Sequence, residues 1–187
     1  MKILLIQPCS DFQRWKGQKN HFGWPPLGLA CVAAATPREH AVRIVDEAIE
    51  PIDFDSPVDV VGIGIMTSNS LRGYEIADAF RARHVPVVIG GIHASMLPGE
   101  AQGHADAVVA GEAEAVWPQL LQDIMRGTLQ PLYRASSFID FWDAPSPRRE
   151  LFKREAYRVP ATVMASRGCP HGCSFCSTSA FFGRKYR

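Results

Sequence analysis

Five short, mostly apolar segments, each separated from the next by a polar turn or a helix-like stretch, constrain this chain more than any other feature. Each is rich in β-branched or other aliphatic residues. They are residues 2–7, 41–45, 58–65, 85–89 and 105–109. Apolar runs of this length are typical of strands that are buried on both faces of a parallel sheet. We therefore predict an α/β fold in which these five strands form one parallel sheet.

Three stretches between and after the strands have the patterns of helices. Residues 26–35 are alanine-rich and begin with proline, and residues 71–83 place apolar side chains at helical spacing. Residues 114–125 form a third predicted helix, which Gly127 closes. Strands that alternate with helices in this way fit a flavodoxin-like (Rossmann-like) doubly wound parallel sheet with strand order 2-1-3-4-5. We assign residues 1–134 to this domain, with 129–134 as a small extra strand.

The chain becomes irregular after this domain. Residues 135–160 contain three prolines and alternating charges, which indicates a linker laid across the surface, with room for a short helix at 148–157. Residues 161–166 have the composition of a strand. They lead directly into a loop that contains three of the chain's five cysteines.

Composition excludes some classes of function. The 187 residues have a net charge of +1, which gives no electrostatic reason to expect nucleic acid or an acidic membrane surface as a partner. No apolar run reaches the roughly 18 residues of a membrane span, and the first residues lack a signal-peptide cleavage site. Cys9 and Cys31 lie outside the cysteine loop, and we expect both to be buried thiols in a reducing cytoplasm.

The cysteine loop predicts a metal centre. Cys169, Cys173 and Cys176 have the spacing C-x3-C-x2-C, and the glycines and proline among them discourage regular structure. Soft thiolates that converge in this way select iron–sulfur clusters, zinc or copper(I). A four-iron cluster usually takes four cysteines, so three would leave one iron open to a substrate or cofactor. The alternatives are a structural zinc site, with His171 as a fourth ligand, and unliganded thiols.

With Phe175 directly before its last cysteine, this loop resembles the cluster loop of the radical S-adenosylmethionine (SAM) enzymes. The resemblance implies that Cys169, Cys173 and Cys176 bind a [4Fe-4S] cluster and that Phe175 packs near the adenine of SAM. In that family the open iron chelates SAM, and one electron from the cluster cleaves it to a deoxyadenosyl radical. We expect residues 161–187 to be the truncated start of the radical SAM (β/α) barrel, and we expect this fragment alone to be inactive.

The loops at the predicted carboxyl edge of the sheet carry small and hydrogen-bonding residues in place of catalytic acids. Ligands of such sheets bind at this edge, near the point where the strand order reverses. Glycines there let the backbone approach a ligand closely, and hydroxyl and amide groups can bond to it. These residues, which suit a wide, flat and mostly apolar ligand, are Thr67, Ser68, Asn69, Gly90, Gly91, Gly111 and Glu112.

Together with the stretch Pro26, Leu27 and Gly28, these loops resemble the cobalamin-binding domains that precede the barrel in the cobalamin-dependent branch of the radical SAM family. The resemblance implies that the loops contact the corrin ring and hold its nucleotide tail. The motif D-x-H-x-x-G, whose histidine binds cobalt in other cobalamin domains, does not occur here, and His21 lacks its spacing. We therefore expect five-coordinate or water-ligated cobalt, or a domain that has lost the cofactor. His93 would contact the corrin or make a structural hydrogen bond.

The sequence thus predicts the N-terminal part of a cobalamin-dependent radical SAM enzyme. In the intact protein, the cluster would cleave SAM, and cobalamin would assist methyl transfer or a related radical reaction at an unactivated carbon of a small-molecule substrate. An external electron donor would be the other partner. The alternatives are a module that only binds cobalamin or another flat ligand, a scaffold domain without its cofactor, and a zinc-stapled interaction domain.

Overall fold

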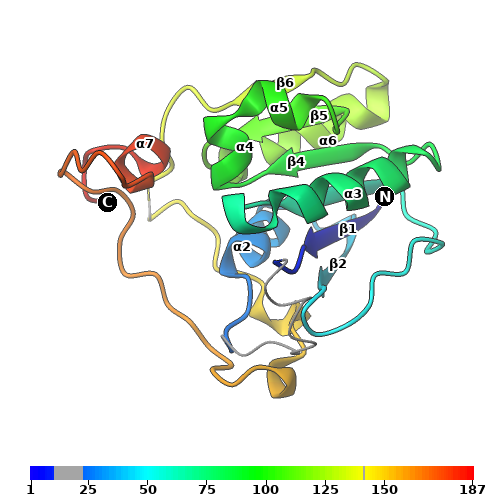
Figure 1. The fold of residues 1–187 in the computed structure, drawn as a ribbon, viewed down its shortest axis with the longest axis horizontal. Helices are drawn as coiled ribbons and strands as arrows, with labels where there is room; N and C mark the ends of the chain where they lie inside the picture. The colour runs from blue at the N-terminus through cyan, green and yellow to red at the C-terminus, as the bar shows by residue number, and fades with distance from the viewer. Residues whose placement is uncertain (11–22, 141) are drawn as a thin grey trace.

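A computed structural model of the chain describes residues 1–10, 23–140 and 142–187. Its centre is a parallel sheet with the order β2-β1-β3-β4-β5-β6 (Figure 1). The strands are β1 (Lys2–Gln7), β2 (Ala41–Asp46), β3 (Val60–Gly64), β4 (Val87–Gly90), β5 (Ala107–Ala110) and β6 (Leu132–Arg134). The predicted fold and the order of its first five strands are confirmed. The small extra strand is confirmed as β6, which pairs in parallel with β5 at the sheet edge.

Helices cover both faces of the sheet, as Figure 1 shows. One face carries α2 (Leu27–Ala35) and α6 (Trp117–Arg126), and the other carries α3 (Ser70–Arg81), α4 (Ile92–Met96) and α5 (Pro98–Gln102). Side chains of a strand alternate between its two faces, so Ile3 and Leu5 pack with the first layer while Leu4 and Ile6 pack with the second. All four are buried, so β1 contributes to the apolar cores on both faces of the sheet.

The helix ends follow their sequence signals. Pro26 directly precedes α2, and Pro118 lies in the first turn of α6. After α6, Gly127 takes a left-handed conformation with φ of 69°, and the N–H of Thr128 donates to the carbonyl of Asp123 at 2.9 Å. The sequence did not predict α4 and α5, because one helical turn is too short to show periodicity. The remaining short elements are η1 (Thr67–Asn69), η2 (Ala113–Ala115), η3 (Arg149–Leu151), η4 (Arg154–Ala156) and α7 (Thr178–Phe182).

The predicted linker is packed against the first domain. Phe152 and Tyr157 are buried in the same core as α2 and α6, and the N–H of Arg148 donates to the carbonyl of Ala30 at 3.1 Å. The helix predicted at 148–157 is present only as the two 3₁₀ turns η3 and η4. This segment packs beside the C-terminal half of β2, where Phe152 and Tyr157 share a core with Ile44.

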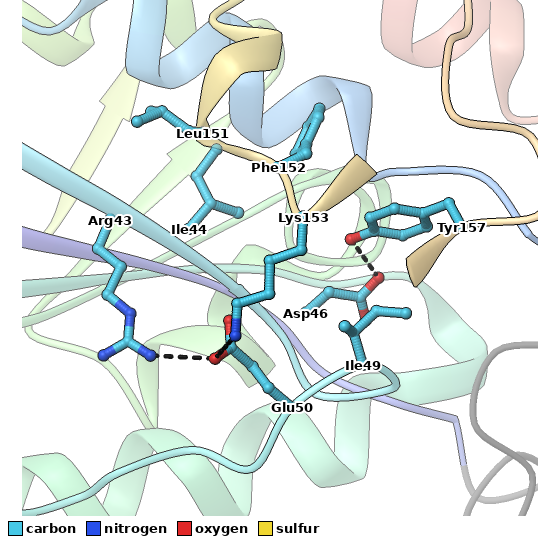
Figure 2. Close-up of a pocket in the computed structure, with 9 residues that line it drawn as sticks. All are labelled: Arg43, Ile44, Asp46, Ile49, Glu50, Leu151, Phe152, Lys153 and Tyr157. Carbon is cyan, nitrogen blue, oxygen red and sulfur yellow. Dashed lines mark hydrogen bonds and ion pairs between the residues drawn. The ribbon is translucent and has the colours of Figure 1, made fainter. Parts of the chain in front are cut away.

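Polar contacts fix the segment beside β2, around a small cavity of about 230 Å³ (Figure 2). Figure 2 shows Arg43 and Lys153 pointing at Glu50, with nitrogen–oxygen distances of 3.1 and 2.6 Å. The hydroxyl of Tyr157 donates to Asp46 at 3.1 Å. Burial of Asp46 raises the pKa of its carboxyl group. The cavity thus lies between β2 and residues 151–157.

The prediction of a strand at 161–166 is wrong, because these residues form neither strand nor helix in the structure. A strand is stable only beside another strand, and this segment pairs with no strand of the described sheet; Val163 is 86% exposed. The residues run instead along the carboxyl edge of the sheet.

Within the described part of the chain, no helix is long and apolar enough to cross a membrane.

Candidate functional site

A cavity of about 1080 Å³ opens at the carboxyl edge of the sheet. Its floor is formed by the ends of β1, β3, β4 and β5, and its sides by the start of α2 and by residues 162–164 and 181–182. Figure 1 shows the arrowheads of β1 and β4 facing the side on which α7 lies. Cavities for drug-sized ligands measure roughly 300–1,000 Å³, so this one is as large as the largest of them.

Most residues predicted from the ligand-edge loops line this cavity: Pro26, Leu27, Gly28, Ser68, Asn69, Gly90, Gly91, Gly111 and Glu112. Two of the glycines leave space that a side chain would occupy. A Cβ atom added at Gly28 or at Gly111 would meet no other atom within 4 Å. Thr67 and His93 lie beside the cavity but do not line it. His21 lies outside the described residues.

Asn69 joins the two loops at the point where the strand order reverses. Its side-chain amide donates to the carbonyl of Pro8 after β1 at 2.9 Å, and its oxygen accepts the N–H of Met66 after β3 at 2.7 Å. Asn69 is buried. The side chain of Asn69 therefore connects the loop after β1 to the loop after β3 at the edge of the cavity.

Ser95 joins the next pair of loops. Its hydroxyl donates to the carbonyl of Gly91 at 2.7 Å and accepts the N–H of Gly111 at 2.8 Å. Gly91 has φ of 100°, and a Cβ there would lie 2.5 Å from the carbonyl oxygen of Ile65, so only glycine fits this turn. The loops after β3, β4 and β5 thus form one connected rim.

His93 makes structural hydrogen bonds in this rim. One ring nitrogen lies 3.1 Å from the hydroxyl of Thr67, and the other lies 3.1 Å from Glu100. The hydroxyl of Tyr74 also donates to Glu100, at 3.0 Å. Hydrogen bonds from His93 and Tyr74 lower the pKa of Glu100. Of the two roles considered for His93, this network supports the structural one.

Glu112 lies in a buried ionic cluster with residues far along the chain. Its carboxylate pairs with Arg167 at 2.8 Å and with Arg187 at 2.8 Å, and Arg167 also pairs with Glu114 at 2.6 Å. Only 2% of the Glu112 side chain is exposed. Burial alone would raise the pKa of Glu112, but the hydrogen bonds from Arg187 and Arg167 outweigh it and lower this pKa. Glu112 therefore borders the cavity as a fully paired carboxylate.

The three cysteines of the loop are accessible. Cys173 and Cys176 are exposed, and Cys169 is half-buried. A side-chain and a backbone hydrogen bond with Thr178 lower the pKa of Cys176. Among the described residues, no three His, Cys, Asp or Glu side chains are grouped so that they could hold one metal ion. Phe175 is 92% exposed and does not line the cavity. The roles of these four residues stay predictions.

Several residues of the cavity wall were not predicted from the sequence. They are chiefly Cys31, Gly62, Gly64, Trp117, Arg167, Phe181 and Phe182. The two strand glycines are the signal that could have found part of this wall, because glycine inside a strand often marks a close approach of another group. A Cβ at Gly62 would lie 3.3 Å from the ring of Trp117. No local pattern marks the others.

Comparison with known proteins agrees with this geometry. A family model described as "B12 binding domain" matches residues 19–121, more than half of the chain. The bacteriochlorophyllide d C-8(2)-methyltransferase of Chlorobaculum tepidum is 36% identical over 170 residues, which cover 86% of this chain and 37% of that protein. An uncharacterized methyltransferase of Pyrococcus horikoshii is 31% identical, covering all of this chain and 47% of that protein.

A hopanoid C-2 methylase of Rhodopseudomonas palustris is 30% identical over 87% of this chain and 32% of its own length. The chain thus spans less than half the length of each of these three relatives. The region that matches the family model contains α2 and the strands β2 to β5, whose loops form most of the cavity. The chain therefore belongs to the B12-binding domain family, and its resemblance to the cobalamin-dependent radical SAM enzymes is confirmed.

Proposed function

We propose that the cavity binds cobalamin, with the corrin ring over the loops after β3, β4 and β5. The observation that carries this proposal is the open space above Gly28, at the start of α2, and Gly111, after β5, which both line a large cavity at the carboxyl edge of the sheet. A broad ligand can approach the backbone at both points without meeting a side chain. The apolar wall beside α2 suits the body of the ring, and the backbone and side-chain amides of the rim suit its amide substituents.

The chain's own residues would hold and orient this ligand. Asn69 and Ser95 fix the loops before a ligand arrives, so little ordering is needed on binding. Ser68 is exposed at the cavity, and its hydroxyl would bond to a polar edge of the ligand. Phe181 and Phe182 would shield one side from water.

We further propose that Cys169, Cys173 and Cys176 bind a [4Fe-4S] cluster in a methyltransferase of the radical SAM type. The chemistry of the donor set supports this, because cysteine thiolates are the usual ligands of such clusters and the loop carries three accessible thiols, which would leave one iron open for SAM. When bound, the cluster supplies the electron that cleaves SAM, and cobalamin supplies a transferable methyl group for an unactivated carbon. The complete protein would need a small-molecule substrate and an external electron donor, in a reducing cytoplasm. A module that binds cobalamin without catalysis is the alternative for this piece alone.

Binding of cobalamin by the isolated chain tests the first part. Anaerobic titration with hydroxocobalamin should change the visible spectrum of the cofactor and give a dissociation constant of about 1 μM or less, or roughly 8 kcal/mol. The same titration after unfolding in guanidinium should give no spectral change. If the folded chain leaves the spectrum unchanged at 100 μM hydroxocobalamin, the domain does not bind cobalamin on its own and serves as a scaffold.

Metal content tests the second part. After anaerobic reconstitution with iron and sulfide, we expect iron and acid-labile sulfide to bind in equal amounts and to be lost when Cys169, Cys173 and Cys176 are all replaced by alanine. Replacement of Cys9, which is buried and outside the loop, should leave the iron content unchanged. Stoichiometric zinc without sulfide in the protein as purified would instead support a structural zinc site.

A further inference from the structure

Residues 167–187 form a closed loop whose two ends are bonded to each other. The N–H of Arg167 donates to the carbonyl of Arg187 at 3.1 Å, and the N–H of Arg187 donates back at 3.0 Å. Closer to the middle of the loop, the N–H of Cys169 donates to the carbonyl of Gly183 at 3.1 Å. Gly168 has φ of 88°, and a Cβ there would collide with the carbonyl of Lys185. All three loop cysteines lie between these paired ends.

One carboxylate of the B12-binding domain holds both ends of this loop. Glu112, two residues after the end of β5, accepts from Arg167 at one end and from Arg187 at the other. Glu114 adds a second bond to Arg167 at 2.6 Å, so two carboxylates face two guanidinium groups and the cluster is neutral. Removing one member of a buried ion pair leaves an uncompensated charge, which is strongly unfavourable. The loop ends therefore cannot leave without disrupting the cluster.

The same loop forms part of the cavity wall. Phe181 and Phe182 line the cavity, and α7, which carries them, packs against α4. Arg187 donates to the carbonyl of Phe182 at 3.0 Å and lies 4.8 Å from the ring centre of Phe138. Whatever contacts this wall from inside the cavity therefore acts on the segment that carries the cysteines.

We infer that Glu112 is a positioning residue: through Arg167 and Arg187 it fixes the cysteine loop on the B12-binding domain and couples the loop to occupancy of the cavity. The paired ends and the ionic cluster carry the first half of this inference. The second half rests on the proposed function, because it requires cobalamin in the cavity and a cluster on the loop. Coupling of this kind is reciprocal, so a ligand that stabilises the closed loop is itself bound more tightly when the loop is closed.

Amide hydrogen exchange of the 187-residue chain tests the anchor without any cofactor. In Glu112→Gln, protection of the amides of Arg167, Cys169 and Arg187 should fall at least about tenfold, while protection of β1 and β3 stays within about twofold. Glu150→Gln is the matched control, because Glu150 pairs with Arg148 at the surface with 64% of its side chain exposed. Unchanged protection of the loop ends in a folded Glu112→Gln variant would overturn the inference.

Arg187→Met gives a second test if Glu112→Gln does not fold, because Arg167 still pairs with Glu112 in that variant. Exchange at Arg167 and Cys169 should again increase about tenfold, and unchanged exchange would count against the anchor. In a double-mutant cycle, Glu112→Gln with Arg187→Met should cost less protection than the sum of the two single changes. Additive losses would mean that the two residues act separately.

Hydroxocobalamin tests the coupling. In the unchanged chain it should raise protection of the loop ends at least about threefold, and Arg187→Met should lower both this increase and the affinity for cobalamin by similar factors. The yield of reconstituted cluster should fall in the same variant while the melting temperature of the core changes little. If cobalamin binds but leaves exchange of the loop ends unaltered, the coupling is wrong although the proposed function stands. If cobalamin does not bind the unchanged chain, the proposed function fails while the anchor is still tested by exchange alone.

Discussion

Replacement of Gly28 by phenylalanine should lower the affinity for cobalamin by about a hundredfold or more, or about 2.7 kcal/mol. Gly28 lies in the first turn of α2 at the cavity, and a Cβ there would meet no atom within 4 Å. An aromatic ring attached at this point would occupy space that the proposed ligand needs. The fold should tolerate it, because most residues have a better helix propensity than glycine, by up to about 1 kcal/mol. Spectroscopic titration with hydroxocobalamin measures the loss.

Gly28→Ala is the control for this experiment. A methyl group fills little of the cavity, so affinity should stay within about threefold while thermal stability stays equal or rises slightly. Both variants should show the same circular dichroism. If Gly28→Phe binds cobalamin as tightly as the unchanged chain, the ligand does not lie over the start of α2.

Replacement of Trp117 by alanine should lower the free energy of unfolding by about 3–5 kcal/mol. Trp117, the first residue of α6, is 2% exposed and packs its ring over the glycine at position 62 of β3. Its indole N–H donates to the hydroxyl of Thr36 at 2.8 Å and so joins the ends of α2 and α6. Alanine would leave a void next to the cavity. For a chain of this size each 1 kcal/mol shifts the melting temperature by roughly 2–4 °C, so scanning calorimetry should show a shift of about 6–20 °C.

Trp117→Phe separates packing from hydrogen bonding. Phenylalanine keeps most of the aromatic contact but cannot donate to Thr36, whose hydroxyl still donates to the carbonyl of Val32 at 3.0 Å. We expect this variant to lose about 1–2 kcal/mol, clearly less than the alanine variant. A loss below about 1 kcal/mol for Trp117→Ala would mean that α6 repacks and that the indole is not central to this core.

The sheet could be predicted because its information is local. Each strand is a short apolar run, and a chain of such runs separated by helices can wind in parallel in only a few ways. The loops at the carboxyl edge follow from that order, which is why nine of the predicted residues line one cavity. The helices α4 and α5 were missed because neither is long enough to show a period.

The ionic cluster could not be predicted, because its members are distant in sequence. Glu112 meets Arg167 55 positions later and Arg187 75 positions later. Nothing in the local pattern around Glu112 distinguishes a carboxylate that contacts a ligand from one that is paired with arginines. The sequence interpretation grouped Glu112 with the cofactor loops, and its location at the cavity agrees with this, whereas its partners belong to the cysteine loop.

The segment that packs beside β2 has a consequence for where one structural module ends. The sequence suggests a boundary at residue 134, yet Phe152 and Tyr157 are buried in the core that α2 and α6 form on one face of the sheet. A piece cut at 134 would lose both aromatic rings and leave Asp46 without its hydroxyl partner. The unit that can be excised, grafted onto another enzyme or inherited as a whole therefore extends to Tyr157, and recombination among related proteins should preserve this stretch together with the sheet.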